Sequence, residues 1–166
     1  MIHDYCKEKC GMVSLWFGNF QSQSQLDGYL STVYQQDDEE DALFQEKLNA
    51  LFILENKNRP CENELRSFYD EFYNQFEYDF GMTFNCDFLE AVFFQNPMDD
   101  ISAMLKGASY CDTFTDSYSR LLCEKLKKQY NALILIYDCH YIGSTTCATH
   151  QGYEIEFMGS VPFIDS

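Results

Sequence analysis

The chain of 166 residues is long enough for one domain with a hydrophobic core and too short for two domains of usual size. Hydrophobic residues make up 46% of it and aromatic residues 17%, which excludes a chain that is disordered throughout. The 27 acidic residues outnumber the 11 basic ones, and the net charge of −16 repels phosphate backbones and anionic lipids. We therefore expect no direct binding to nucleic acid or membranes, and expect the chain to attract a basic protein.

The cysteines and the N-terminal stretch bear on the compartment. Eight cysteines are spread along the chain, and its first residues lack the unbroken apolar run of a signal peptide. Without export, disulfide bonds are not expected. We therefore predict a cytoplasmic protein whose thiols stay reduced and behave as small buried hydrophobes.

The first predicted elements are an arm and a strand. Residues 1–11 are polar and are expected to form a mobile arm, so the single domain is predicted to span residues 12–166. Alternating apolar residues over 13–17 predict a strand with two different faces. Gly18 and Asn19 then predict a turn, because both tolerate a positive φ.

Helical patterns fill the next part of the chain. Ser22 and Gln25 have the spacing of a capping box and predict a helix start. The buried stripe of that helix is predicted to contain Leu26, Tyr29, Leu30, Val33 and Tyr34. A second helix is predicted over residues 43–52 and a loop over 55–64. An apolar stripe then predicts a helix over 65–80, which Gly81 ends.

Residues 87–107 are predicted to form a strand and a short helix. The strand covers 87–94, and Asn96 with Pro97 is expected to cap the helix, which Gly107 ends. A further helix is predicted to begin at Thr115, with Tyr118, Leu121, Leu122 and Leu126 facing inward and Lys125, Lys127 and Lys128 in its last turn.

The C-terminal part is predicted to be mostly strand. The nearly continuous apolar run over 132–142 is typical of a central strand. After a loop over 143–152, residues 153–157 alternate and predict a strand antiparallel to the preceding one. The whole pattern indicates a single α+β domain in which several amphipathic helices pack on a mostly antiparallel sheet of about four strands.

Two clusters have residue types that could support chemistry. Asp138 and His140 share a face of a predicted strand, where they could orient one another or hold a metal ion. A working catalytic dyad needs a third group, and no motif supplies one. His3, Cys6 and Cys10 provide only half of a zinc-site spacing. We therefore expect no catalytic residue, metal or cofactor.

The acidic residues form the other candidate site. Five consecutive acids follow the first helix, and more acids lie on the polar face of the predicted helix over 65–80, where Glu77 and Asp79 are expected to be solvated. Like-charged blocks are either solvated surface or interaction segments, and both interpretations stay open. The candidate partner-binding residues are Asp37, Asp38, Glu39, Glu40, Asp41, Glu62, Glu64, Asp70, Glu71 and Glu77.

Three stretches together resemble one known family. The opening VSLWFGNFQSQSQLDGYL, at residues 13–30, resembles the start of the immunity protein 22 family of bacterial polymorphic toxin systems. Residues 74–93, NQFEYDFGMTFNCDFLEAVF, resemble its central helix-to-strand passage. NALILIYDCHY, at 131–141, and YEIEFMGSVPF, at 153–163, resemble its closing hairpin.

The resemblance implies a fold signature and a function. The signature residues would be Trp16, Gly18, Asn19 and Phe20, with Trp16 buried where the core begins. The implied function is a non-enzymatic antitoxin that binds a cognate, basic toxin domain in the cytoplasm, as a monomer or weak dimer. Many such toxins are nucleases, whose basic clefts an acidic protein could occupy. The alternatives are an acidic regulatory module outside any toxin system, and an enzyme using Asp138 and His140.

Overall fold

The structure is a computed structural model, which describes residues 6–31, 40, 42, 74–123 and 125–165. Its central element is one five-stranded sheet in the order β2-β3-β1-β5-β4, in which all neighbouring strands are antiparallel. The strands are β1 (Cys6–Asn19), β2 (Leu89–Asp100), β3 (Lys125–Tyr141), β4 (Cys147–His150) and β5 (Tyr153–Pro162). The α+β class with an antiparallel sheet is confirmed. The sheet has five strands rather than about four because β4 lies within the predicted loop over 143–152.

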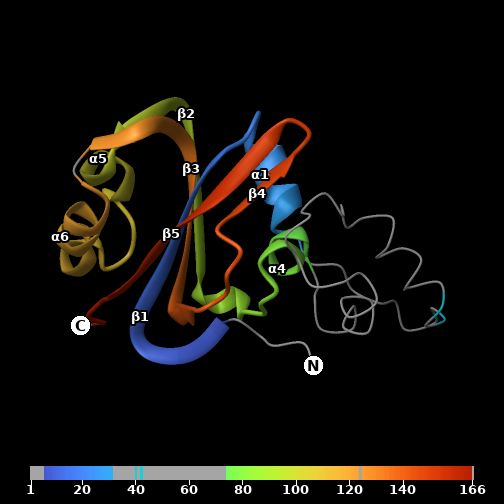
Figure 1. Cartoon of the computed structure of the whole chain (residues 1–166), viewed down its shortest axis with the longest axis horizontal. Coiled ribbons are helices and arrows are strands. Elements are labelled where there is room, and N and C mark those ends of the chain that lie inside the picture. The colour runs from blue at the N-terminus through green and yellow to red at the C-terminus, as the bar shows by residue number, and fades with distance from the viewer. Residues whose placement is uncertain (1–5, 32–39, 41, 43–73, 124, 166) are drawn as a thin grey trace.

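Helices cover both faces of the sheet (Figure 1). The helices α1 (Gln23–Tyr29) and α4 (Gln75–Phe80) lie on one side. The helices α5 (Ile101–Leu105) and α6 (Cys111–Leu122) lie on the other. The short 3-10 helix η1 (Cys86–Phe88) leads directly into β2. The predicted helix over 43–52 and the predicted loop over 55–64 lie outside the described residues.

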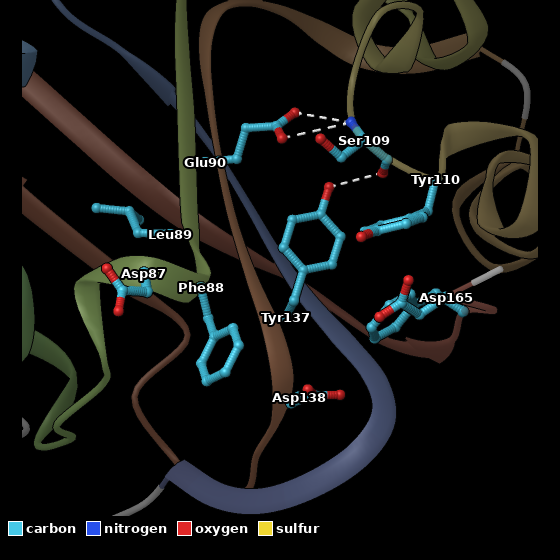
Figure 2. Close-up of a pocket in the computed structure, with 10 residues that line it drawn as sticks. Asp87, Phe88, Leu89, Glu90, Ser109, Tyr110, Tyr137, Asp138 and Asp165 are labelled. Carbon is cyan, nitrogen blue, oxygen red and sulfur yellow. Dashed lines mark hydrogen bonds between the residues drawn. The ribbon is translucent and has the colours of Figure 1, made fainter.

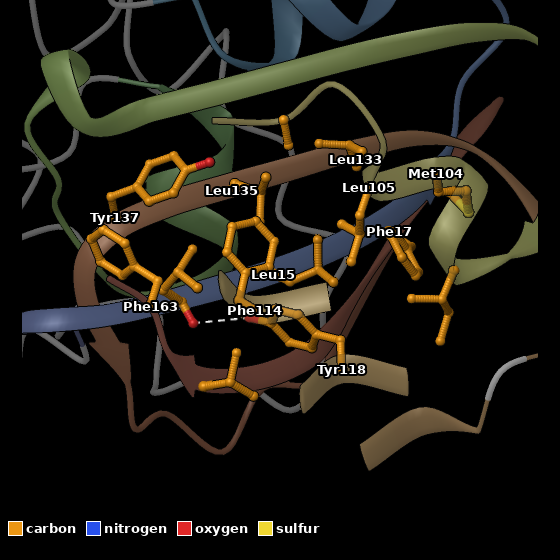
Figure 3. Packing of buried hydrophobic residues seen from close by; sticks show 14 of the residues in the cluster. Leu15, Phe17, Met104, Leu105, Phe114, Tyr118, Leu133, Leu135, Tyr137 and Phe163 are labelled. Carbon is orange, nitrogen blue, oxygen red and sulfur yellow. Dashed lines mark hydrogen bonds between the residues drawn. The ribbon is translucent and has the colours of Figure 1, made fainter. Parts of the chain in front are cut away.

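The two faces of β1 are those predicted from its alternation, and each face contributes to a separate part of the hydrophobic core. Val13, Leu15 and Phe17 pack on the side of α5 and α6, together with Phe114 and Tyr118 (Figure 3). On the opposite face, Trp16 belongs to the cluster that includes residues of α1 and α4. Because the sheet is buried on both faces, residues 132–137 of β3 are almost continuously apolar, and all are buried.

The tyrosine Tyr118 anchors α6 to the sheet. Its hydroxyl lies 2.9 Å from the carbonyl oxygen of Val13 and 3.0 Å from that of Gly159, and it donates to this pair of acceptors. Figure 3 shows its ring packed beside Phe114, beneath the strands. Burial raises the pKa of Tyr118 well above its ordinary value, so the phenol is neutral at physiological pH.

β1 begins earlier than predicted. Residues 6–11, expected as part of a mobile arm, belong to β1, and residues 6–8 pair with β3, Cys6 opposite Tyr141 and Glu8 opposite Cys139. The register then shifts between Glu8 and Val13. The prediction of a mobile arm is therefore wrong for residues 6–11, while residues 1–5 lie outside the described part. The polar composition misled the prediction because cross-strand pairing can hold a strand that buries little apolar surface.

The predicted fold signature lies where β1 meets α1. Trp16 is fully buried, as expected, with ring centroids 4.9 Å from Phe76 and 5.0 Å from Phe157. Gly18 and Asn19 still belong to β1, so the turn predicted there is wrong, and the chain bends at Gln21. A Cβ atom at Gly18 would lie 2.8 Å from the carbonyl oxygen of Glu154, so close strand packing, and not a positive φ, requires glycine there.

Local contacts then direct the chain from β1 into α1. The Phe20 backbone donates to Asn131 Oδ1 at 2.8 Å, and Asn131 Nδ2 donates back to the Phe20 carbonyl at 2.7 Å. The predicted N-cap is confirmed, because Ser22 Oγ accepts from the Gln25 backbone at 3.1 Å. The return bond of a capping box differs: Gln25 Oε1 accepts at 2.7 Å from the backbone of Gln21, the residue before the N-cap.

Several helix boundaries differ from the predictions. Gly81 ends α4 with φ of 64°, as predicted. However, α4 begins at Gln75, directly after its N-cap Asn74, so the predicted helix is not continuous through residue 74. Asp100, and not Asn96, caps α5. The helix predicted from Thr115 begins at Cys111, and its inward-facing set is wrong for Leu121, which is exposed.

The last predicted turn of α6 is instead the start of β3. Lys125, Lys127 and Lys128 therefore lie on a strand, and Lys128 forms ion pairs with Glu154 and Glu156 of β5. The topology also differs, because β1 lies between β3 and β5. The predicted pairing of 153–157 with 132–142 is wrong: β5 pairs with β1 and β4.

The cysteines do not follow the prediction. Cys139 is disulfide-bonded, so the expectation that all thiols stay reduced is wrong in this structure. The expectation of burial is also wrong for most described cysteines, because Cys10, Cys86, Cys123 and Cys147 are exposed. The exposure of a given cysteine depends on its tertiary placement, which a residue's average tendency to be buried does not fix.

Candidate partner-binding cleft

A cleft of about 250 Å³ opens where β2, β3, α6 and the C-terminal segment meet (Figure 2). It is called here the acidic cleft, and it is lined by Asp87, Phe88, Leu89, Glu90, Ser109, Tyr110, Tyr137, Asp138, Phe163 and Asp165. Four of these ten side chains are carboxylates and four are aromatic. None of them belongs to the acidic set that the sequence pattern had singled out.

Hydrogen bonds fix the wall between β2 and the loop before α6. Glu90 accepts two bonds from the Ser109 backbone N–H, at 3.0 Å to Oε1 and 3.3 Å to Oε2. The Tyr137 hydroxyl donates to the Ser109 carbonyl at 2.8 Å. Ser109 is therefore held from β2 and from β3 at once, and Figure 2 shows both sets of bonds.

Two lining residues have backbone conformations that are uncommon for residues other than glycine. Tyr110 has φ of 59° directly before α6, and Asp138 has φ of 53° within β3. Asp138 Oδ1 accepts a bond from the Gly11 backbone at 2.9 Å, which ties β3 to the irregular part of β1. Such conformations persist where the surrounding structure determines them, and they concentrate at functional sites.

Aromatic rings form the apolar part of the acidic cleft. Tyr137 and Phe163 make an edge-to-face pair with centroids 5.2 Å apart, and the Tyr110 ring lies 5.7 Å from Tyr137 and 5.6 Å from Phe163. Tyr110 is 40% exposed and Phe88 is 42% exposed. Large, rigid and half-exposed aromatic side chains are the type that dominates the binding energy of protein interfaces.

The carboxylates of the acidic cleft have no positive partner among the described residues. Asp87, Glu90, Asp138 and Asp165 form no ion pair with any residue in the described part of the chain. Elsewhere on the sheet, by contrast, Lys128 forms ion pairs with two glutamates of β5.

The negative charge of the acidic cleft contributes to the raised pKa values of two of its tyrosines. A hydrogen bond with Asp165, and then the charge of the same carboxylate, raise the pKa of Tyr110. Burial, followed by the charge of Glu90, raises the pKa of Tyr137. Both phenols therefore stay neutral, and the site carries its negative charge on the carboxylates alone.

The size and chemistry of the cleft fit one side chain of a partner protein. A volume of about 250 Å³ lies below the roughly 300–1,000 Å³ of sites that enclose drug-sized ligands. A guanidinium or ammonium group there would meet both carboxylates and aromatic faces, and each of these attracts cations. The arrangement can therefore bind a lysine or arginine of a partner.

The acidic residues predicted from the sequence have different outcomes. Glu40 is exposed, which fits a surface role. Glu77 is only 4% exposed, and its Oε2 accepts a bond from the Phe84 backbone at 3.2 Å, so the expectation that it is solvated is wrong. Asp37, Asp38, Glu39, Asp41, Glu62, Glu64, Asp70 and Glu71 lie outside the described residues.

Asp79 was also expected on the solvated side of a helix, and this is wrong. It is fully buried, with Oδ2 2.6 Å from His150 Nε2. The Tyr29 hydroxyl donates to the same oxygen at 2.7 Å, and Gln75 Nε2 donates to Oδ1 at 2.8 Å. This buried polar cluster links α1, α4 and β4. Gln75 and Asp79 are neighbours on α4, but Tyr29 and His150 are too far from them in sequence for local patterns to predict the cluster.

The structure does not join the residues proposed for an enzyme. Asp138 lines the acidic cleft, whereas His140 does not, and no hydrogen bond links their side chains in the described part of the chain. Within the same residues, no three His, Cys, Asp or Glu side chains are arranged to hold a metal ion. His3 and the side chain of Cys6 are not described. No described helix has both the length and the apolar character needed to cross a membrane.

Comparison with known proteins identifies one family. No curated protein and no solved structure matches the chain. The family model described as Immunity protein 22 matches residues 13–163 of the 166 residues, from the middle of β1 to the last aromatic residue of the acidic cleft. The family resemblance of the sequence is thus confirmed, and the chain belongs to the Immunity protein 22 family.

Proposed function

We propose that the chain is a non-enzymatic antitoxin, which binds a cognate toxin domain of a bacterial polymorphic toxin system and blocks its activity. Membership of the Immunity protein 22 family supports this role. The observation that carries the binding site is the acidic cleft, whose four carboxylates have no cationic partner within the described residues. The missing positive charge is supplied by the toxin.

The proposed toxin domain is basic, and a nuclease is the class that fits best. Nucleases bind phosphate backbones with lysine and arginine side chains, so their active clefts are cationic. A chain with a net charge of −16 is attracted to such a surface from a distance, which speeds association at low salt. Nucleic acid is the target of such a toxin inside the cell, so we place the antitoxin in the cytoplasm as well.

Co-expression tests this function directly. The probe is a candidate toxin domain chosen from the genes that flank the gene of this chain, produced under an inducible promoter with and without the antitoxin. The proposal predicts that growth stops with the toxin alone and continues when the antitoxin is present, and that the two proteins co-purify. A toxin domain that neither co-purifies nor loses its toxicity would overturn the proposal.

A charge-reversal pair tests the site. Glu90→Lys with Asp165→Lys reverses two cleft carboxylates, and Asp27→Lys with Asp116→Lys makes the same change at exposed positions of α1 and α6. We expect the cleft pair to weaken toxin binding by about 100-fold or more, and the control pair by much less. Equal losses in both variants would show that net charge, and not the acidic cleft, determines binding.

A further inference from the structure

β2 is an edge strand, and its first half is regular. Residues 89–93 pair with β3 in an unbroken antiparallel register, from Leu89 opposite Ile136 to Phe93 opposite Ala132. The sheet order places β2 at one end, so no strand within the described ranges pairs with its other edge. Backbone N–H and C=O groups of alternate residues point to opposite edges, so every second residue of this segment directs its groups away from β3.

Apart from the charge of Glu90, the first half of β2 lacks the features that usually deter strand pairing. Protected edges are short, or contain proline, lysine or a bulge. β2 has 12 residues, and its proline, Pro97, and its register shifts all follow Phe93. No lysine or arginine occurs between Asn85 and Leu105. The backbone is therefore regular over 89–93, directly before Phe94, and a further strand could extend the sheet there.

Both faces of this segment are half-buried, and all of its residues except Glu90 are apolar. Leu89, Ala91 and Phe93 pack against the cluster of Trp16, and Val92 and Phe94 pack against the cluster on the opposite face of the sheet. All six residues of 89–94 have intermediate exposure. An added strand would place its side chains beside these residues on both faces, and such cross-strand pairs stabilise sheets.

The charge of the region identifies the occupant. The segment starts at the acidic cleft, with Asp87 before it and Glu90 within it. A second copy of this chain, with the same net charge of −16, would bring like charges together along the shared edge, which is unfavourable. An extended segment that carries lysine or arginine is complementary to both the backbone edge and the carboxylates.

We propose that the edge of β2 over residues 89–94 accepts an extended, basic segment of the toxin domain as an additional strand, with one cationic side chain of that segment in the acidic cleft. This inference rests on the proposed function. Backbone hydrogen bonds to β2 supply affinity that depends little on sequence, while the cleft selects the cationic side chain. The two features are adjacent because Leu89 and Glu90 belong to both.

Amide hydrogen exchange tests the strand addition. The full ¹⁵N-labelled chain is measured by NMR alone and bound to the neighbouring-gene toxin domain, made harmless by substitution. In the complex, alternate amides within 89–94 should exchange at least about tenfold more slowly than in the free chain. The intervening amides, which already bond to β3, should change less. A toxin that binds and leaves exchange at 89–94 unchanged would overturn the strand addition and leave the antitoxin function intact. A toxin that does not bind would overturn the function itself.

Proline variants give a second readout. Ala91→Pro and Val92→Pro each remove one backbone donor, and because the residues are consecutive, one of the two donors points to the open edge. The variant at that position should fold normally and lose about tenfold or more in toxin affinity, while Gln95→Pro, beyond the regular segment, should bind like the parent. Unchanged affinity in every folded variant would contradict the proposal. So would a free chain that sediments as a dimer with residues 89–94 already protected.

Discussion

The chain contains two groups of acidic side chains whose environments are opposite. Asp79 is fully buried among donors from Tyr29 and Gln75 and beside His150. The carboxylates of the acidic cleft lie at an open surface and form no ion pair within the described residues. The first group joins α1, α4 and β4. In the second, Glu90 and Asp138 are half-buried and accept backbone bonds from Ser109 and Gly11. Asp87 and Asp165 are exposed, and no described cation pairs with any of the four.

The difference separates structural acids from acids available for binding. A buried carboxylate is tolerated only when donors or an opposite charge compensate its lost hydration, so its partners must come from the same fold. An exposed carboxylate is compensated by water, and a partner protein can replace that water. The number of acids in a stretch therefore says less about binding than whether the fold already satisfies them.

The largest expected effect comes from breaking the buried group. Asp79→Ala leaves His150 and Tyr29 without their shared acceptor, so we expect a loss of about 3–5 kcal/mol in the free energy of unfolding. Chemical denaturation measures this loss, and Asp116→Ala, at an exposed position of α6, is the control. A loss below about 1 kcal/mol would show that the buried group is not structural.

A smaller loss in the free energy of unfolding is expected when a buried, uncharged hydroxyl group is removed. Tyr118→Phe removes the hydroxyl that serves the carbonyls of Val13 and Gly159, which should cost about 1–2 kcal/mol. Tyr137→Phe, in the acidic cleft, is a useful comparison because its hydroxyl serves only the Ser109 carbonyl. Equal stability of the parent and Tyr118→Phe would contradict the anchoring role of this bond.

The same tyrosine predicts a pH dependence. Burial raises the folded-state pKa of Tyr118, so the folded protein keeps this proton at pH values where the unfolded chain loses it. The contribution is complete below the unfolded pKa of about 10 and is lost as the pH rises toward the folded value. Stability should therefore fall above about pH 10, and less steeply in Tyr118→Phe. Identical slopes in both proteins would show that Tyr118 does not contribute.

Within the acidic cleft, an aromatic truncation should affect binding and not folding. Phe88 is 42% exposed, so Phe88→Ala should change the free energy of unfolding by less than about 0.5 kcal/mol. It should weaken toxin binding by about tenfold, as measured by calorimetry. Ile142→Ala is the matched control, since Ile142 is 49% exposed and does not line the cleft. Equal toxin affinities of Phe88→Ala and Ile142→Ala would show that Phe88 is not part of the interface.

The smallest effect is expected at Glu40. This residue is exposed and does not line the acidic cleft. Glu40→Gln should leave stability within about 0.5 kcal/mol and the toxin association rate within about twofold of the parent. A larger decrease in the association rate would show that the acidic run at 37–41 takes part in toxin binding.

The predictions from sequence succeed where neighbours in the chain determine the structure. The two faces of β1 follow from simple alternation, Ser22 caps α1 through a bond to Gln25, and Gly81 ends α4. Each of these features depends on residues within a few positions, for which residue type limits the possible conformations.

The acidic cleft could not be predicted in the same way. It joins residues around positions 88, 110, 138 and 164, which only the sheet order and the loop before α6 bring together. That order places β1 between β3 and β5, whereas the sequence suggested a closing hairpin. The burial of Glu77 and Asp79 was missed for a related reason: a helix with structure on several sides has no solvated face.

The most direct test of binding through the acidic cleft is the rate of toxin association at several salt concentrations. Glu90→Gln with Asp165→Asn neutralises two cleft carboxylates, and Asp27→Asn with Asp116→Asn neutralises two exposed acids elsewhere. The cleft pair should bind about tenfold more slowly than the parent at low salt, with a flatter salt dependence, and the control pair should resemble the parent. Identical rates and slopes for both pairs would contradict binding through the acidic cleft.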